Sequence, residues 1–231
     1  MIYVSSDWHG CPLDTVRHLF RKAGFSEADY CFVLGDVIDR GDHGVELLQW
    51  LMLQGNVELI RGNHEDMMLG SEMLFEEIDD DSLRRLNSRV VEAVNLWMYN
   101  GAQPTIAGLK RLSGSDRNYV FEYVSEAPLY ECVEAGGRKF ILTHSGLQYF
   151  SEDKALDDYT KHELIWNRPK ITDRYFSDIF TVFGHTPTGF YGKEHMGKMV
   201  KTETWADIDT GVAMGLTPML LRLDDMKEFY V

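Results

Sequence analysis

Short apolar runs alternate with amphipathic segments through the first sixty residues of the chain. Ile2–Ser5, Tyr30–Leu34 and Val57–Ile60 are apolar runs of strand length, and we expect strands that are largely buried. Leu13–Ala23 and Val45–Leu53 instead carry apolar residues at helical spacing. This β-α-β-α-β order predicts an α/β architecture with parallel strands.

After the third strand the pattern changes, and we expect a helical insertion at approximately residues 66–127. Helices are predicted over Met67–Ile78 and Leu83–Tyr99, with the Ser82 side chain capping the second one. Residues 101–114 have the composition of a loop. We interpret the insertion as lying over the functional site. Ordinary connecting helices without a substrate role are the alternative.

Strand patterns return after the insertion. Leu129–Val133 and Lys139–Thr143 flank a Gly-Gly turn, which predicts a hairpin. Phe180–Phe183 is a further apolar strand, and Met219–Leu223 with Glu228–Val231 predict a terminal hairpin.

Length and composition favour one globular domain over residues 1–231. The chain has 44% hydrophobic and 12% aromatic residues, enough for one large core. No window approaches ~18 consecutive apolar residues, so we expect no membrane span. The first seven residues lack a basic region before an apolar segment, and they are more typical of a strand than of a signal peptide.

Net charge limits the kinds of molecule that the chain is expected to bind, and the cysteine content indicates its cellular compartment. The formal net charge is −14, which repels a nucleic-acid backbone, so any anionic substrate must be attracted locally by metal ions and a few arginines. Cys11, Cys31 and Cys132 show no CxxC spacing and predict no disulfide framework. Cytoplasmic location is the simplest expectation.

Side chains able to bind metals follow the predicted strands. Five segments share this property: Asp7-Trp8-His9, Gly35–Gly41, Arg61–Glu65, His144 and Gly184–Thr186. In α/β folds ligands bind beyond the carboxyl ends of strands, where these segments fall. Together they offer carboxylate, amide and imidazole ligands for two divalent cations that share one bridge. Such a pair is suited to in-line attack on phosphorus.

The segments differ in what each indicates alone. Asp7 and His9 are two residues apart, so both can reach one cation from an extended segment, but this spacing is common by chance. Asp36 stands in Gly-Asp-x-x-Asp-Arg-Gly, where it could bridge two cations, and a polar turn is the alternative. His144 or His185 alone would be read as a structural histidine. Five matches in order make coincidence a poor explanation.

These motifs resemble those of the phosphoprotein phosphatase family of binuclear metallophosphoesterases, and most closely its bacterial and phage branch, typified by the lambda phage protein phosphatase. The resemblance runs from Asp7 to about Pro218. It implies a four-layer α/β-β/α sandwich with two sheets face to face and helices outside. Pro187 stands where many metallophosphoesterases, nucleases among them, have the second histidine of Gly-His-x-His. Trp8 replaces an aliphatic residue of the family, and we expect it to line the site.

The resemblance also implies a metal centre with two divalent ions. Its six ligands would be Asp7 and His9 at the first metal, Asn63, His144 and His185 at the second, and Asp36 as the bridge. Oxygen and nitrogen ligands without thiolate suit Mn²⁺, our first expectation, with Fe and Zn²⁺ as alternatives.

Further residues would act on the substrate. By the same resemblance, His64 would protonate the leaving oxygen, with Asp39 as its carboxylate partner. Arg40, Arg61 and Arg168 would hold phosphate oxygens. A histidine suits this proton transfer because its ordinary pKa lies close to neutrality.

The implied function is hydrolysis of phosphoric monoesters by a hydroxide that bridges the two metals. Serine/threonine phosphoproteins are the leading substrate class, with phosphotyrosine in addition. The alternative is a symmetrical bis(5'-nucleosyl)-tetraphosphatase that cleaves diadenosine tetraphosphate. We expect a phosphorylated protein or a small phosphoester as partner, and neither nucleic acid nor membrane; the sequence does not indicate an oligomeric state. A non-catalytic scaffold is disfavoured because all six ligands and His64 are present.

Overall fold

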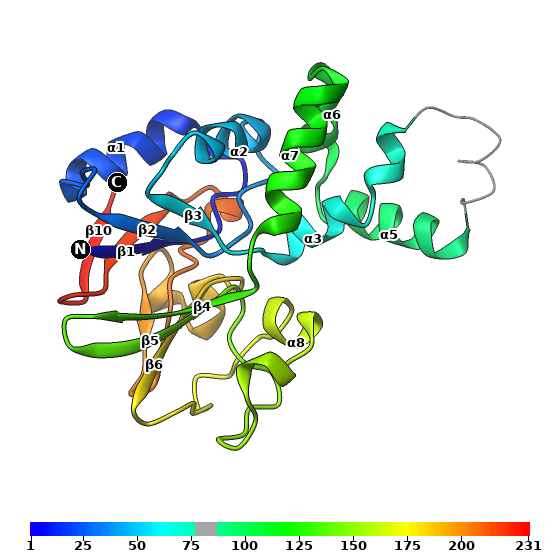
Figure 1. The fold of residues 1–231 in the computed structure, drawn as a ribbon. Coiled ribbons are helices and arrows are strands. Elements are labelled where there is room, and N and C mark those ends of the chain that lie inside the picture. The colour runs from blue at the N-terminus through cyan, green and yellow to red at the C-terminus, as the bar shows by residue number, and fades with distance from the viewer. Residues whose placement is uncertain (77–86) are drawn as a thin grey trace.

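Two five-stranded sheets lie face to face in the computed structural model, which describes residues 1–76 and 87–231 (Figure 1). The predicted cap at Ser82 and the first residues of the predicted 83–99 helix therefore lie outside the described residues. The strands of the first sheet follow the order β10-β9-β1-β2-β3. Their bounds are β1 Ile2–Ser5, β2 Tyr30–Val33, β3 Val57–Leu59, β9 Met219–Arg222 and β10 Lys227–Tyr230.

The first sheet is parallel at its centre, as predicted. Val4 of β1 pairs with Phe32 of β2, and Phe32 pairs with Glu58 of β3. Strand β9 runs antiparallel to β1, and β10 antiparallel to β9, so the predicted terminal hairpin closes this sheet on its other side. Helices α1 (Leu13–Ala23) and α2 (Gly44–Met52) are the crossovers between the parallel strands.

The second sheet has the order β4-β5-β6-β8-β7. The predicted hairpin is present as β4 and β5, joined by Gly136 and Gly137, and β6 runs parallel to β5. The short strands β7 and β8 were not predicted. The bounds are β4 Tyr130–Ala135, β5 Arg138–Thr143, β6 Ile179–Phe183, β7 Val200–Lys201 and β8 Trp205–Asp207.

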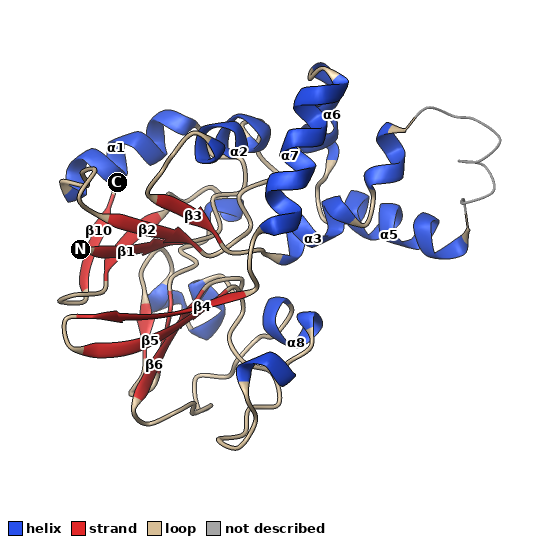
Figure 2. Ribbon diagram, in the orientation of Figure 1, coloured by secondary structure: helices blue, strands red, loops and turns tan. Residues whose placement is uncertain are grey.

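Apolar side chains fill three layers and hold the two sheets together. Between the sheets, Val4 and Phe32 pack in one cluster with Phe140 and Val182. A second cluster joins the outer face of the first sheet to its helices. A third covers the outer face of the second sheet around Trp205, where irregular chain and the five-residue helix α8 (Lys161–Ile165) form the covering layer (Figure 2). The four-layer α/β sandwich is thus confirmed, with a fourth layer poor in helix.

The insertion is more helical than predicted. In its described part the helices are α3 (Asn63–Leu69), α5 (Ser88–Tyr99), α6 (Gln103–Arg111) and α7 (Gly114–Glu126), with a 3-10 turn at Glu72–Phe75. They stand together beside the ends of β1 and β2 (Figure 1).

Two expectations for the insertion were wrong. The predicted 67–78 helix instead begins at Asn63 and ends before Gly70. Residues 101–114 contain α6 rather than a loop, because Pro104 occupies the first turn, where a missing N–H costs nothing. The Ser113 side chain then caps α7 by accepting from the backbone N–H of Asp116.

No helix in residues 1–76 and 87–231 is long and apolar enough to cross a membrane. Cys11, Cys31 and Cys132 are free thiols, in agreement with the absence of a predicted disulfide framework.

The Gly-Gly turn between β4 and β5 offers a matched test of packing. Both glycines have positive φ, +55° at Gly136 and +75° at Gly137. A Cβ on Gly136 would lie 2.0 Å from the carbonyl oxygen of Asp224, whereas one on Gly137 would meet no heavy atom within 4 Å. We expect Gly137→Ala to lower the free energy of unfolding by about 1 kcal/mol and Gly136→Ala by about 2 kcal/mol or more. Urea titration measures both, and equal losses would contradict the predicted clash.

Candidate metal centre

The predicted metal ligands all converge on one edge of the two sheets. Five of them stand in turns that follow strands, Asn63 is the first residue of the helix that follows β3, and each is at most 5% exposed. The six are Asp7 and His9 after β1, Asp36 after β2, Asn63 after β3, His144 after β5 and His185 after β6. The carboxyl ends of strands from both sheets therefore meet at the site.

The backbone of these turns is unusual. Among residues 1–76 and 87–231, eight non-glycine residues have positive φ, and six of them belong to the site: Asp7, His9, Asp36, Asp39, Arg40 and His185. The left-handed region is sterically costly for residues other than glycine, although Asn, Asp and His tolerate it best. The concentration of such residues here indicates that the fold strains its backbone to aim these side chains inward.

Asp36 lies at the centre of the cluster. Its Oδ2 is 3.7 Å from His9 Nε2 and 3.8 Å from His64 Nε2, and its Oδ1 is 3.4 Å from His144 Nε2. Asp36 belongs to two groups of three side chains. One contains His9 and His64, the other His144 and His185, and within each group the possible ligand atoms lie within 4.8 Å of one another. This shared position is that of a bridging carboxylate.

The remaining predicted ligands flank these two groups. Asp7 Oδ1 is 3.9 Å from His9 Nε2. His144 Nε2 is 2.9 Å from Asn63 Oδ1 and 3.2 Å from His185 Nδ1. The structure thus brings all six predicted ligands together.

Unsatisfied buried atoms show that this donor set fits divalent cations. Asp7 Oδ1 and His185 Nε2 have no hydrogen-bond partner in the described part of the chain. Buried polar atoms normally have a hydrogen-bond partner, so two without one beside a cluster of imidazoles and carboxylates indicate that a bound group completes the site. A cation is such a partner, and nitrogen and oxygen donors without thiolate suit Mn²⁺, Fe or Zn²⁺.

The electrostatics of the site point the same way. Burial lowers the pKa of His9 and of His185 well below the usual range, so both rings are neutral and have a lone pair free for a cation. Burial, with the charge of Asp209 nearby, raises the pKa of Asp7. Burial also raises the pKa of Asp209 to about 6. Such buried carboxylates disfavour one another as anions, and a cation among them would relieve that cost.

Asp39 and His64 form a buried pair next to this cluster. His64 Nδ1 donates to Asp39 Oδ2 at 2.6 Å, and both side chains are at most 1% exposed. Burial opposes a charged imidazole, but Asp36 and Asp39 outweigh it and raise the pKa of His64. The ring therefore keeps Nδ1 protonated and presents Nε2 to the centre.

The three predicted arginines behave differently. Arg40 lies over the cluster, with guanidinium nitrogens 3.2 Å from His9 Nε2 and 3.1 Å from His64 Nε2. Arg168 reaches the edge of the site and donates to the backbone carbonyl of His185 at 3.0 Å.

The structure does not turn the third arginine towards the centre. The Arg61 guanidinium instead donates to the backbone carbonyls of Ser125 and of Ala127, at the end of α7.

Glu65 is a site residue that the sequence motifs did not assign. Its carboxylate is fully buried and accepts three backbone N–H groups, from Asp36 at 2.8 Å, Val37 at 2.9 Å and Gly62 at 3.0 Å. These bonds clamp the turn after β2 to the turn after β3. Its place beside His64 in the same motif was the only signal in the sequence.

Trp8 does not line the site, contrary to our expectation. It is fully buried, its indole N–H donates to Ser5 Oγ at 2.8 Å, and its ring packs against Phe20 and Trp50. The wide indole packs against side chains of both α1 and α2, so it belongs to the core cluster beneath the turn.

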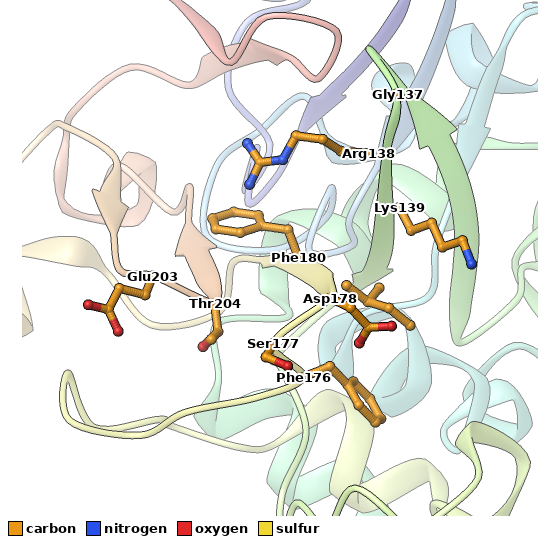
Figure 3. Close-up of a pocket in the computed structure, with 10 residues that line it drawn as sticks. Gly137, Arg138, Lys139, Phe176, Ser177, Asp178, Phe180, Glu203 and Thr204 are labelled. Atoms are coloured by element: carbon orange, nitrogen blue, oxygen red, sulfur yellow. The ribbon is translucent and has the colours of Figure 1, made fainter.

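Hollows on the surface lie at both ends of the strands. One of about 460 Å³ adjoins the centre, where His9, Arg40 and Leu216 form part of its wall. Another of about 360 Å³ lies at the start of β5 and β6, where the Arg138 guanidinium stands over the Phe180 ring (Figure 3). None of the predicted site residues, all of which the structure describes, lines that second hollow.

Comparison with known proteins places these features in a family context. The model of the calcineurin-like phosphoesterase family matches residues 1–210. The symmetrical bis(5'-nucleosyl)-tetraphosphatase of Buchnera aphidicola subsp. Baizongia pistaciae is 23% identical over 161 residues, which cover 69% of this chain and 48% of that protein. Serine/threonine-protein phosphatase BSL2 of Arabidopsis thaliana is 42% identical over 76 residues, 28% of this chain and 7% of that protein.

Solved structures agree on the fold. The crystal structure of a candidate diadenosine tetraphosphatase superposes with a TM-score of 0.67 at 15% identity, and the match covers 100% of this chain and 92% of that one. At such identity the likeness is one of fold alone. The chain spans about half the length of the tetraphosphatases that it matches, and a much smaller share of the plant phosphatase.

The Glu65 clamp generates a prediction about metal affinity. Glu65→Gln replaces one acceptor oxygen by an NH₂ group that faces backbone N–H groups, so the turn that carries Asp36 should loosen. We expect the free energy of unfolding to fall by about 1–3 kcal/mol and Mn²⁺ affinity to fall about 10–100-fold. Urea titration in chelator and calorimetric titration with Mn²⁺ measure these.

Glu58→Gln is the matched control for this change. Its side chain accepts from the Tyr30 hydroxyl away from the centre, a bond that the amide oxygen of glutamine can keep. We expect changes within about 0.5 kcal/mol and unaltered metal affinity. If Glu65→Gln bound Mn²⁺ as tightly as this control, Glu65 would have no role in placing Asp36.

Proposed function

Because this chain belongs to the calcineurin-like phosphoesterase family, we propose that it is a protein phosphatase acting on phosphoserine and phosphothreonine, and also on phosphotyrosine. Hydrolysis of phosphoric esters is the activity of this family, and a phosphorylated protein or a small phosphoester is the proposed partner. One observation carries the proposal: the Asp36 carboxylate is shared by two groups of imidazoles, and the Asp39–His64 pair stands beside it.

The centre would hold two divalent cations, with Mn²⁺ as our first choice and Fe or Zn²⁺ as alternatives. The proposed ligands are Asp7, His9 and Asp36 for one cation, and Asp36, Asn63, His144 and His185 for the other. When bound, such a pair polarises phosphoryl oxygens and activates water near neutral pH.

The side chains around the centre would bind the phosphoryl group and supply a proton. We assign Arg40 and Arg168 to phosphate oxygens, since planar guanidinium groups donate two parallel hydrogen bonds to such oxygens. The third predicted arginine, Arg61, could join them only after leaving the carbonyls at the end of α7. Leaving alkoxides are basic, and we assign their protonation to Nε2–H of His64, with Asp39 keeping the ring in position.

We place the chain in the bacterial and phage branch of the family, typified by the lambda phage protein phosphatase. Pro187 in place of a second histidine supports this assignment, because the first cation then has fewer protein ligands. We also propose that residues 1–231 act as one domain with the insertion at about 66–127. In support, insertion residues such as Trp97 and Leu109 share a core cluster with Val33 of the first sheet.

A second candidate function is symmetrical hydrolysis of diadenosine tetraphosphate. Relatives named for that activity align with a larger share of this chain than the protein phosphatase does. The shape of the surface supports phosphoproteins instead. No described residue of the insertion lines the 460 Å³ hollow beside Arg40. Among the described residues, the aromatic rings in its wall are those of His9 and His43. A nucleobase would find little to stack on there, whereas a peptide could lie along it.

The experiment that tests this choice compares kcat/KM for a phosphoserine peptide and for diadenosine tetraphosphate, both with Mn²⁺. We expect the peptide to be the better substrate. A much higher value for the dinucleotide would establish the second candidate instead, and failure to hydrolyse either compound with Mn²⁺ present would remove both.

His64→Asn tests the proposed acid. Asparagine is similar in size to imidazole but cannot give up a proton, so we expect kcat on the phosphoserine peptide to fall about 100–10,000-fold while the content of bound Mn²⁺ stays nearly unchanged. Steady-state kinetics and metal analysis measure the two effects. His18→Asn, an exposed change on α1, is the control. Activity of His64→Asn equal to that control would show that another group supplies the proton.

A further inference from the structure

The buried carboxylate of Asp39 is held on both oxygens by side chains from the insertion. The indole N–H of Trp97, on α5, donates to Oδ2 at 2.8 Å, and this is the oxygen that accepts from His64. The hydroxyl of Thr105, on α6, donates to Oδ1 at 2.6 Å. Asp39 and Trp97 are 0% exposed and Thr105 is 1% exposed, so water does not compete for these bonds.

Thr105 holds the backbone of the same residue as well. Its Oγ1 accepts from the N–H of Asp39 at 2.9 Å, so this hydroxyl acts as donor and acceptor to one residue. Asp39 has a φ of 70°, in the left-handed region, where a non-glycine residue needs support from its surroundings. Thr105 thus fixes both the turn and the rotamer of the carboxylate.

We infer that Trp97 and Thr105 are positioning residues, which orient the Asp39 carboxylate and, through it, the imidazole of His64. The inference rests on the proposed function, in which a hydroxide oxygen bonds to phosphorus as the P–O bond to the leaving group breaks. The leaving oxygen takes the proton from Nε2 of His64, which leaves that ring neutral. Neither residue touches the substrate. Their effect is exerted through the angle at which Nε2–H meets the leaving oxygen, and proton transfer depends steeply on that geometry.

A positioning role differs from a merely structural one in its dependence on the leaving group. An ester with an acidic leaving group, such as p-nitrophenyl phosphate, needs little help from a proton donor, whereas phenyl phosphate needs more. Loss of fold or of metal would slow both esters alike. Misplacement of His64 would slow phenyl phosphate selectively.

The test uses Thr105→Val in the full chain with Mn²⁺, with Thr105→Ser as the matched control that keeps the hydroxyl. We expect Thr105→Val to lower kcat about 10-fold or more on phenyl phosphate and less than about 3-fold on p-nitrophenyl phosphate. KM and the content of bound Mn²⁺ should stay near those of the native chain. Thr105→Ser should restore most of kcat on phenyl phosphate.

A second measurement shows whether Thr105 acts through His64. In a His64→Asn background, Thr105→Val should cause almost no further loss, since the proton donor is already gone. Trp97→Phe, which keeps the ring and removes the donor, carries the same test if Thr105→Val does not fold.

The outcomes separate this inference from the proposed function. A native chain that hydrolyses neither these esters nor the phosphoserine peptide with Mn²⁺ overturns both. An active native chain in which Thr105→Val and Trp97→Phe slow the two esters equally overturns the positioning role alone. A full additional loss in the His64→Asn background does the same.

Discussion

The buried charge of Asp36 is the constraint around which the site is built. Burial disfavours the charged form of this carboxylate, but His144 and His64 beside it hold its pKa well below the usual range. A buried ion is tolerated only where partners and hydrogen bonds compensate its lost hydration. The backbone supplies one of these hydrogen bonds, because the N–H of His64 donates to Asp36 Oδ1 at 3.1 Å.

That compensation requires parts of the chain that are distant in sequence. Glu65 fixes the turn of Asp36 from α3, the helix that begins after β3, and His144 arrives from the second sheet. The apolar cluster between the sheets sets the distance between their edges, and so the distance between the two groups of ligands. Packing and chemistry are therefore joined, since a shift of one sheet against the other would part His144 from Asp36.

Local pattern predicted the strands well and the insertion poorly. Strands such as β1 and β2 are continuous apolar runs that end in Ser-Ser-Asp or Gly-Asp, where burial and turn chemistry agree. Helix α6 was missed because residues 101–114 have the composition of a loop, although Pro104 fits the first turn of a helix. Likewise, Gly70 ends α3 within a segment whose composition alone favours a longer helix.

The metal ligands could be predicted from the sequence because each of them follows a predicted strand. That two sheets bring these segments together was implied by the family resemblance and not by the spacing of the residues. Functions that depend on the rotamer of a side chain could not be predicted from the sequence. Arg61 stands next to Gly62 and Asn63 in the chain, yet its long side chain turns to the end of α7. Trp97 and Thr105 lie 58 and 66 residues from Asp39, and no motif connects a helix donor to that carboxylate.

The left-handed turns have a consequence for how mutagenesis of this protein is interpreted. Asp36, Asp39 and His185 occupy backbone conformations that Asp, Asn and His tolerate and that alanine adopts only at a cost of about 1–2 kcal/mol each. Truncation to alanine would thus delete a functional group and deform its loop in one step. Asparagine scanning separates these effects, because an amide retains the turn-forming side chain while it changes charge and basicity.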